Sequence, residues 1–227
     1  QSGFNLEAGP LYSIGYLYGY ADGSARIYFA LHHLAVDSVS WRILAEDLKD
    51  IYDRKELGSK GSSYRQWVQA VREYANTHER EKEYWEHVLV DYDTHQLGKL
   101  APNEDVQSHA SFNLTQEQTQ KLLRDSNKAY HTQINDLLLT ALAYALSEVT
   151  GASVAHIMLE GHGREEIDSS IDITRTLGWF TTMYPVRLEV HEDLGRSLKN
   201  IKETLRQTPN KGIGYGALVG YQQETLP

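Results

Sequence analysis

Residues 27–44 read IYFALHHLAVDSVSWRIL, an apolar run that leads into two adjacent histidines and then into residues at helical spacing. Side chains of a strand alternate between its faces, so His32 and His33 would not both point into one cleft. We therefore expect one histidine to be chemical and one structural, because a neutral imidazole can exchange a proton near pH 7. The alternative is a pair of core histidines bound to backbone groups.

Asp37 lies four residues after His33 and has two interpretations. It can support the histidine directly, or it can fix the loop by pairing with an arginine such as Arg42 or Arg175. We favour the structural role. His33 and Asp37 are also possible metal ligands, but no further spacing completes a ligand set, so no metal is expected.

A second polar cluster, EGHGRE at 160–165, follows an apolar run. Glycines on both sides of His162 allow unusual backbone angles and the close approach of another chain. Glu160 stands at the end of the expected strand, where partial burial would suit a proton donor or acceptor. The alternative is a solvated, charged turn.

The segment 172–180, DITRTLGWF, combines an arginine with hydroxyl groups and two aromatic side chains. Such a loop can form the wall of a narrow channel. Trp179 and Phe180 can equally belong to the core, which is the commoner place for an aromatic pair.

The chain has 227 residues, 22 Lys and Arg against 31 Asp and Glu, a net charge of −9 and no cysteine. Without cysteine it has no disulfide, zinc–thiolate site or cysteine nucleophile, and we expect a reducing, cytoplasmic setting. The acidic balance argues against nucleic acid as a partner, because phosphate binding requires clustered lysine and arginine. No apolar stretch is long enough to cross a membrane, and no phosphate loop, dinucleotide fingerprint or nucleophile elbow occurs.

Hydrophobic periodicity predicts helices and strands mixed along the chain, an α/β class with α+β character. The polar residues 91–107 lack a clear period and are interpreted as a linker between a part at 1–90 and a part at 108–227. The glycine-rich residues 212–221 are expected to have little to pack against, and the chain is interpreted as a fragment. The expected elements are a hairpin at 11–20 and 25–33, helices at 38–55, 64–90 (two helices, broken near Asn76-Thr77), 134–149 and 194–207, strands at 108–114, 154–160 and 183–190, and a helix capped by Thr115 and Gln118.

Four motifs in this order resemble those of a known family. The stretch HHLAVDSVSWRIL at 32–44 is similar to the His-His-x-x-x-Asp signature of the condensation-domain superfamily of nonribosomal peptide synthetases. EGHGRE at 160–165, TRTLGWFT at 174–181 and PNKGIGYG at 209–216 resemble the epimerization branch of that superfamily. Ser38 stands where many relatives have glycine. The opening segment and the final Asn-Tyr-Leu-Gly-type motif of the family are not found.

The resemblance implies a chloramphenicol-acetyltransferase-like fold of two lobes, with the 1–90 part in the N-terminal lobe and the 108–227 part in the C-terminal lobe. A tunnel between the lobes would admit a substrate thioester on the phosphopantetheine arm of a carrier protein, with neighbouring synthetase domains as further partners and with no metal and no tightly bound cofactor. His33 and Glu160 correspond to the proton-transfer groups of the family. The residues expected to support them are His32, Asp37, Arg164, Arg175 and Trp179.

The function implied is epimerization at Cα of an L-aminoacyl or peptidyl thioester, by proton transfer from one face and to the other. One alternative is condensation, which uses the same His33 for amide formation and needs no group such as Glu160 on the opposite face. Another is a fragment that docks a carrier protein without catalysis. The sequence does not indicate the amino acid, the peptide product or the order in which the two groups act.

Overall fold

The computed structural model describes residues 3–93 and 110–221. The described chain divides into two compact units. Unit 1 comprises Gln1–Tyr74 and His162–Thr182, and unit 2 comprises Ala75–Gly161 and Met183–Pro227. The predicted linker 91–107 lies largely outside the described residues, and the two-part division at that linker stays a prediction. The units differ from that division at two places: His162–Thr182 groups with the N-terminal residues, and residues 75–90 group with the C-terminal ones.

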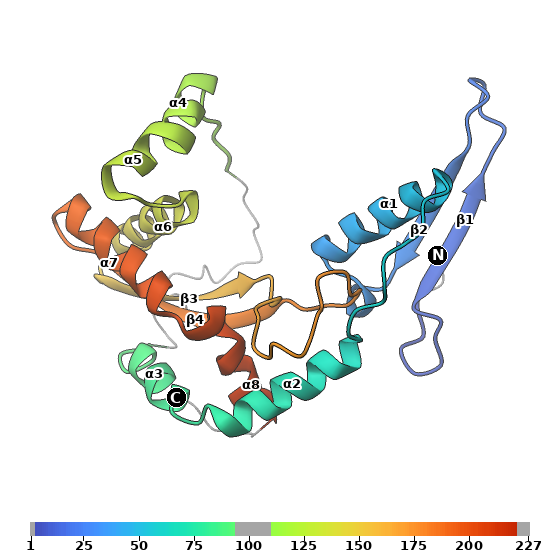
Figure 1. Cartoon of the computed structure of the whole chain (residues 1–227). Coiled ribbons are helices and arrows are strands. Elements are labelled where there is room, and N and C mark those ends of the chain that lie inside the picture. Colours follow the sequence, from blue (N-terminus) through green and yellow to red (C-terminus); the bar gives the residue numbers. More distant parts are fainter. Residues whose placement is uncertain (1–2, 94–109, 222–227) are drawn as a thin grey trace. The chain divides into compact units, whose positions relative to one another are not determined.

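A β-hairpin begins unit 1, as the alternating pattern predicts (Figure 1). β1 (Tyr12–Leu17) pairs antiparallel with β2 (Arg26–Leu31), and Ile14 lies opposite Phe29 in the register. At the turn, Asp22 accepts a hydrogen bond from the Ser24 amide at 2.9 Å, an Asx turn that reverses the chain.

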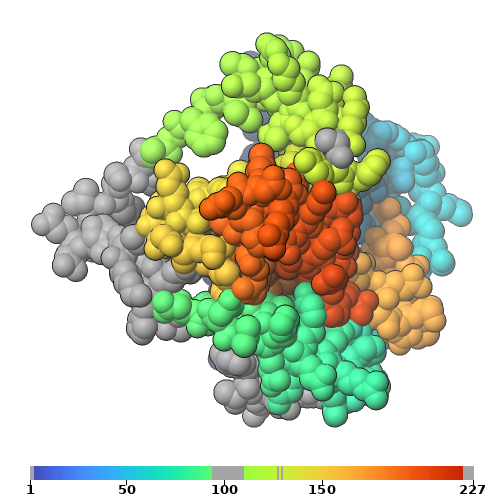
Figure 2. Space-filling view, turned by 90° about the vertical axis from the view of Figure 1, so that its left-hand side faces the viewer, coloured from blue at the N-terminus to red at the C-terminus, as the bar shows by residue number. Residues whose placement is uncertain are grey.

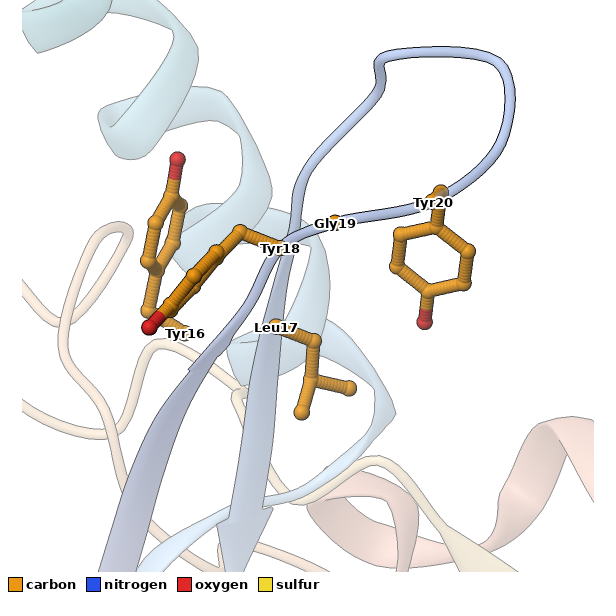
Figure 3. Close-up of a pocket in the computed structure, with 5 residues that line it drawn as sticks. All are labelled: Tyr16, Leu17, Tyr18, Gly19 and Tyr20. Atoms are coloured by element: carbon orange, nitrogen blue, oxygen red, sulfur yellow. The ribbon is translucent and has the colours of Figure 1, made fainter.

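Aromatic side chains crowd the tip of this hairpin. The rings of Tyr16 and Tyr18 stack at 5.8 Å between centroids, and the Arg26 guanidinium lies 4.4 Å from the centre of the Tyr20 ring. Figure 3 shows Tyr16 and Tyr18 side by side, with Tyr20 pointing away from them. These side chains are exposed, so the hairpin presents an apolar surface to solvent.

The two histidines follow β2 in a short 3₁₀ turn, η1 (His33–Ala35), which leads into α1 (Ser38–Tyr52). Asp37 caps α1 by accepting a hydrogen bond from the Ser40 amide at 2.7 Å. α2 (Tyr64–Thr77) and α3 (Glu81–Val88) confirm the predicted pair of helices.

Unit 2 contains a second two-stranded sheet, formed by β3 and β4, together with several helices (Figure 1). Thr115 and Gln118 form the predicted capping box at the start of α4. Gly151 ends α6 in the left-handed conformation with φ +73°. The elements that follow α3 are α4 (Gln116–Gln120), a π-helical turn η3 (Lys121–Asp125), α5 (Ser126–Tyr130), α6 (Ile134–Thr150), β3 (Val154–Gly161), β4 (Thr182–Glu189), α7 (Leu194–Gln207), η4 (Pro209–Gly212) and α8 (Ile213–Tyr221).

The core of unit 2 forms where one face of β4 meets the helices. Alternate β4 residues Tyr184, Val186 and Leu188 are buried, as the two-residue period of a strand requires. Trp85 from α3 and Ile201 from α7 are fully buried in the same cluster. Each such side chain contributes about 1.5–3 kcal/mol by leaving water. Figure 2 shows α7 in orange at the centre of one face of this unit, with α3 below it.

Two predictions about local structure are wrong. Of the expected strand 108–114, residues 110–114 form no strand, and Phe112 is 86% exposed. The alternating pattern of this segment was therefore not sufficient to pair it with another strand. Residues 108–109 lie outside the described residues. The glycine-rich segment forms η4 and α8 and has buried residues. Gly214 lies so close to α3 that a Cβ atom would be 1.8 Å from a Glu81 carboxylate oxygen, so glycine here permits close packing.

No helix within the described ranges is both long and apolar enough to cross a membrane.

Candidate functional site

A buried ion pair joins the two motifs that the sequence singles out. Arg164 Nη2 donates to Asp37 Oδ1 at 3.0 Å and to Oδ2 at 3.1 Å. The two side chains are only 9% and 6% exposed, and both belong to unit 1. Residues 127 positions apart in the chain are therefore held together by a charge-assisted contact.

Other N–H groups of the Arg164 guanidinium bind the backbone of the 172–180 loop. Its Nη1 donates to the carbonyl oxygens of Ile173 at 3.1 Å and Thr176 at 2.9 Å. The guanidinium carbon lies 3.9 Å from the centre of the Phe180 ring, a cation–π contact. Arg164 thus fixes the 172–180 loop to the start of α1.

Burial alone would raise the pKa of the Asp37 carboxyl group. Hydrogen bonds from Arg164 and Ser40, together with the positive charge of Arg164, outweigh that effect. The pKa of Asp37 therefore lies below its usual value, and the carboxylate is ionised at neutral pH.

The arginine partners suggested for Asp37 were wrong. Arg42 lies 3.7 Å from Glu46 one helical turn away. Arg175 binds Glu46 at 3.0 Å and also Asp47, so it ties its loop to the outer part of α1. Sequence spacing cannot reveal which distant arginine folds back onto a given carboxylate.

Ser40 is a residue of this site that the sequence analysis did not single out. Its hydroxyl donates to the Gly178 carbonyl and accepts from the Gly178 amide, both at 3.1 Å, and it lies 3.1 Å from Arg164 Nη2. The only sequence signal is its position three residues after Asp37, which is typical of a helix cap.

His32 has a structural contact. Its Nδ1 accepts a hydrogen bond from the Leu34 amide at 3.1 Å and caps η1. β2 ends at Leu31, so neither histidine lies in the strand. The two side chains differ in their surroundings because His32 caps the turn that begins at His33. The prediction that strand alternation separates them was wrong.

His33 is arranged differently. Its ring lies against the indole of Trp179 with 5.0 Å between centroids and 62° between planes. Within residues 3–93 and 110–221, no hydrogen bond to a His33 ring nitrogen is found, and the residue is exposed. Neither ring nitrogen therefore has a partner among these residues, and a chemical role for His33 stays a prediction.

The EGHGRE segment places its members in different surroundings. His162 Nδ1 accepts from the Arg164 amide at 3.0 Å, and its Nε2 lies 3.1 Å from Glu165. Gly163 has φ +66°, and a Cβ atom there would lie 1.6 Å from the Phe180 carbonyl oxygen. The predicted close approach of another chain segment to these glycines is therefore observed at Gly163.

Glu160 lies near the end of β3 in unit 2. Its side chain is exposed, so the partial burial that would suit a proton donor or acceptor is not observed within the unit. The joint action of Glu160 with His33 stays a prediction. Within the described ranges, no group of three or more His, Asp or Glu side chains is arranged to hold a metal ion.

The motifs and this geometry agree with the comparison to known families. A family model described as Condensation domain matches residues 1–225. The chain belongs to the condensation-domain family. It is 47% identical over 222 residues to N-(5-amino-5-carboxypentanoyl)-L-cysteinyl-D-valine synthase of Amycolatopsis lactamdurans, covering 97% of this chain and 6% of that protein. It is 42% identical to gramicidin S synthase 1 of Brevibacillus brevis, covering 95% of this chain and 21% of that protein.

Solved structures give the same fold. The epimerization domain from the third module of tyrocidine synthetase B matches with a TM-score of 0.80 and 38% identity. The match covers 98% of this chain and 54% of that one, so this member of the condensation-domain family spans about half of that epimerization domain. The condensation domain of the Monacolin K polyketide synthase matches with a TM-score of 0.75 at 17% identity, which shows the shared fold alone.

Proposed function

We propose that this chain carries the proton-transfer residues of an epimerization domain in a nonribosomal peptide synthetase. The substrate class is an aminoacyl or peptidyl thioester on the phosphopantetheine arm of a carrier protein. Inversion at Cα is the reaction.

Similarity favours the epimerization branch. The chain is 38% identical to the tyrocidine synthetase B epimerization domain and 17–20% identical to solved condensation domains. The name of the Amycolatopsis relative includes a D-configured valine, a residue that requires inversion at some step. A different protein, a four-domain nonribosomal peptide synthetase, is among the solved structures that share this fold. The chain also covers only 6% of the Amycolatopsis synthase. Both observations support neighbouring domains, including a carrier protein, as proposed partners.

The different surroundings of the two histidines carry the proposal. His32 uses its Nδ1 to cap η1, whereas His33 rests on Trp179 with both nitrogens free of described hydrogen bonds. A general base or acid needs such an unoccupied nitrogen within reach of the proton that it transfers.

The chemistry requires two groups. A thioester carbonyl acidifies the neighbouring Cα–H bond because the electron pair left by the proton delocalises into an enolate. One group removes the proton from one face, and the second donates a proton to the other face, so the product is the D-thioester with no net change of atoms. A single base would return the proton to the face from which it came. His33 and Glu160 are the pair proposed for these roles.

Condensation is the second candidate, supported by the fold shared with solved condensation domains. Amide formation by attack of an amine on a thioester needs one base and no donor on the opposite face. Glu160 therefore distinguishes the two reactions.

The test is deuterium uptake at Cα, followed by mass spectrometry, when an L-aminoacyl carrier protein is incubated in D₂O with this chain and with a longer synthetase polypeptide that contains it. Uptake with D-product that is lost in Glu160→Gln supports epimerization. Glu148→Gln, a change at an exposed glutamate of α6, is the matched control and should keep full uptake. Amide formation without uptake would assign the chain to condensation, and binding without either reaction would assign it to docking.

A further inference from the structure

Tyr64 contacts the loop whose Trp179 side chain packs against His33. None of the four sequence motifs includes Tyr64. Tyr64 is the first residue of α2, and its hydroxyl donates to the Trp179 carbonyl oxygen at 2.7 Å. Its ring meets the Phe180 ring edge to face, with 5.0 Å between centroids and 90° between planes. The side chain therefore contacts two consecutive residues of the loop, once through its hydroxyl and once through its ring.

A third contact shows how closely the loop follows the Tyr64 ring. A Cβ atom at Gly178 would lie 2.3 Å from Tyr64 Cδ2 and 2.8 Å from Cε2. Phe180 Cε2 would lie 2.9 Å away as well. Gly178 has no unusual φ, so these two rings, and not a backbone requirement, exclude a side chain at this position. The three residues Gly178, Trp179 and Phe180 are thus fitted around Tyr64.

Two of these residues, Gly178 and Phe180, are also bound by residues at the start of α1. Ser40 binds the amide and carbonyl of Gly178, and Asp37 accepts from the Phe180 amide at 3.4 Å. Those contacts fix the residues on either side of Trp179. Among the described residues, the hydrogen bond that fixes the carbonyl group of Trp179 itself comes from Tyr64.

Trp179 needs this restraint because burial does not hold it. The residue is 39% exposed, and its indole is the described contact of the His33 ring. A shift of the Trp179 backbone would move the indole, and the imidazole would lose the surface that orients it.

We propose that Tyr64 is a positioning residue for His33, acting through the Trp179 carbonyl and the Trp179 indole. The inference rests on the proposed function, in which His33 transfers a proton, and it adds a residue that sets the orientation of that group. Tyr64 itself does not touch the reacting atoms in this assignment.

Tyr64→Phe tests the inference, because it keeps the ring and removes the hydroxyl. The first measurement uses no substrate: nuclear magnetic resonance of ¹³C,¹⁵N-labelled histidine, with the His33 signals assigned through His33→Asn. We expect the His33 ring signals to shift in Tyr64→Phe and the far-ultraviolet circular dichroism to stay the same. Tyr52→Phe, at a tyrosine of α1 that is 88% exposed, is the matched control and should leave the His33 signals unmoved.

The second measurement is the rate of Cα deuterium uptake in a synthetase polypeptide that contains this chain. Since small displacements of a reacting group lower rates strongly, we expect a loss of about tenfold in Tyr64→Phe and none in Tyr52→Phe. Unchanged His33 signals together with an unchanged rate would overturn the inference.

Trp179→Phe keeps the inference testable if Tyr64→Phe does not fold. It leaves Tyr64 and the backbone carbonyl in place and changes only the surface against His33, so the His33 signals should shift. Unmoved His33 signals in Trp179→Phe would overturn the inference. If the wild type takes up no deuterium, the proposed function fails, while the histidine spectrum still decides the positioning role.

Discussion

Arg164 binds both carboxylate oxygens of Asp37, and this ion pair links the residue that caps α1 to the residue that follows Gly163. A buried charge pair of this kind specifies which segments must meet, since either charge alone would be costly to bury. The pair therefore connects the motif that contains His33 to the part of the EGHGRE segment that lies in unit 1.

Asp37→Asn should destabilise unit 1 strongly. The substitution leaves the Arg164 guanidinium buried without its counter-charge, which costs about 3 kcal/mol or more. Urea unfolding followed by tryptophan fluorescence measures the change. Asp50→Asn is the control, because Asp50 pairs with Lys55 at an exposed position and its loss should change the midpoint little. Equal midpoints for the two variants would contradict a structural role for the buried pair.

The same carboxylate predicts a pH dependence. The folded pKa of Asp37 lies below its unfolded value of about 3.9, so its contribution to stability is present above that pH and is lost as the pH falls through the folded pKa. Unfolding free energies measured between neutral pH and about pH 3 should fall more steeply in the wild type than in Asp37→Asn. Parallel curves would show that Asp37 does not contribute to the acid sensitivity.

Local signals in the sequence were enough for most elements. The hairpin, α6 and α7 were predicted because alternation, helical spacing, a capping residue and a terminal Gly or Pro all act within a few residues. The bounds of α7 (Leu194–Gln207) agree with the prediction at both ends. α8 was missed because its glycines resemble a loop in sequence. The close approach of Glu81 accounts for Gly214, and that of Tyr184 accounts for Gly212 just before the helix, whereas Gly216 and Gly220 have open space around them.

The candidate site was predictable as a set of motifs but not as a set of contacts. The histidine pair and EGHGRE are visible as residue types in order. The choice of Arg164 for Asp37, and the roles of Ser40 and Tyr64, depend on segments more than 100 positions apart that come together only in the fold. No periodicity or spacing records such a pairing.

Gly163→Ala should lower the stability of the protein strongly, although it adds only a methyl group. An added Cβ would meet the Phe180 carbonyl oxygen at 1.6 Å, and the backbone has φ +66°, so the loop must move. We expect a loss of about 4 kcal/mol or more, the range of severe substitutions. The matched control is Gly151→Ala, which shares a left-handed φ of +73° but has open space around it. It should cost only about 1–2 kcal/mol, the backbone strain alone.

Urea unfolding of the two glycine variants separates the contributions. The difference between them measures the close approach of Phe180 to Gly163, since both carry the strain of a left-handed backbone. Similar losses in both would mean that the loop can move away from residue 163 at little cost.

The two histidines should respond to substitution in opposite ways. His32→Ala removes the acceptor for the Leu34 amide and should lower stability by about 1 kcal/mol, the usual cost of a lost cap. His32→Asn should recover most of that stability, because asparagine is a good capping residue. His33→Ala removes an exposed ring and should leave the unfolding midpoint nearly unchanged while abolishing Cα deuterium uptake. A stable His32→Ala variant without uptake, beside an active His33→Ala variant, would reverse the assignment and make His32 the proton-transfer group.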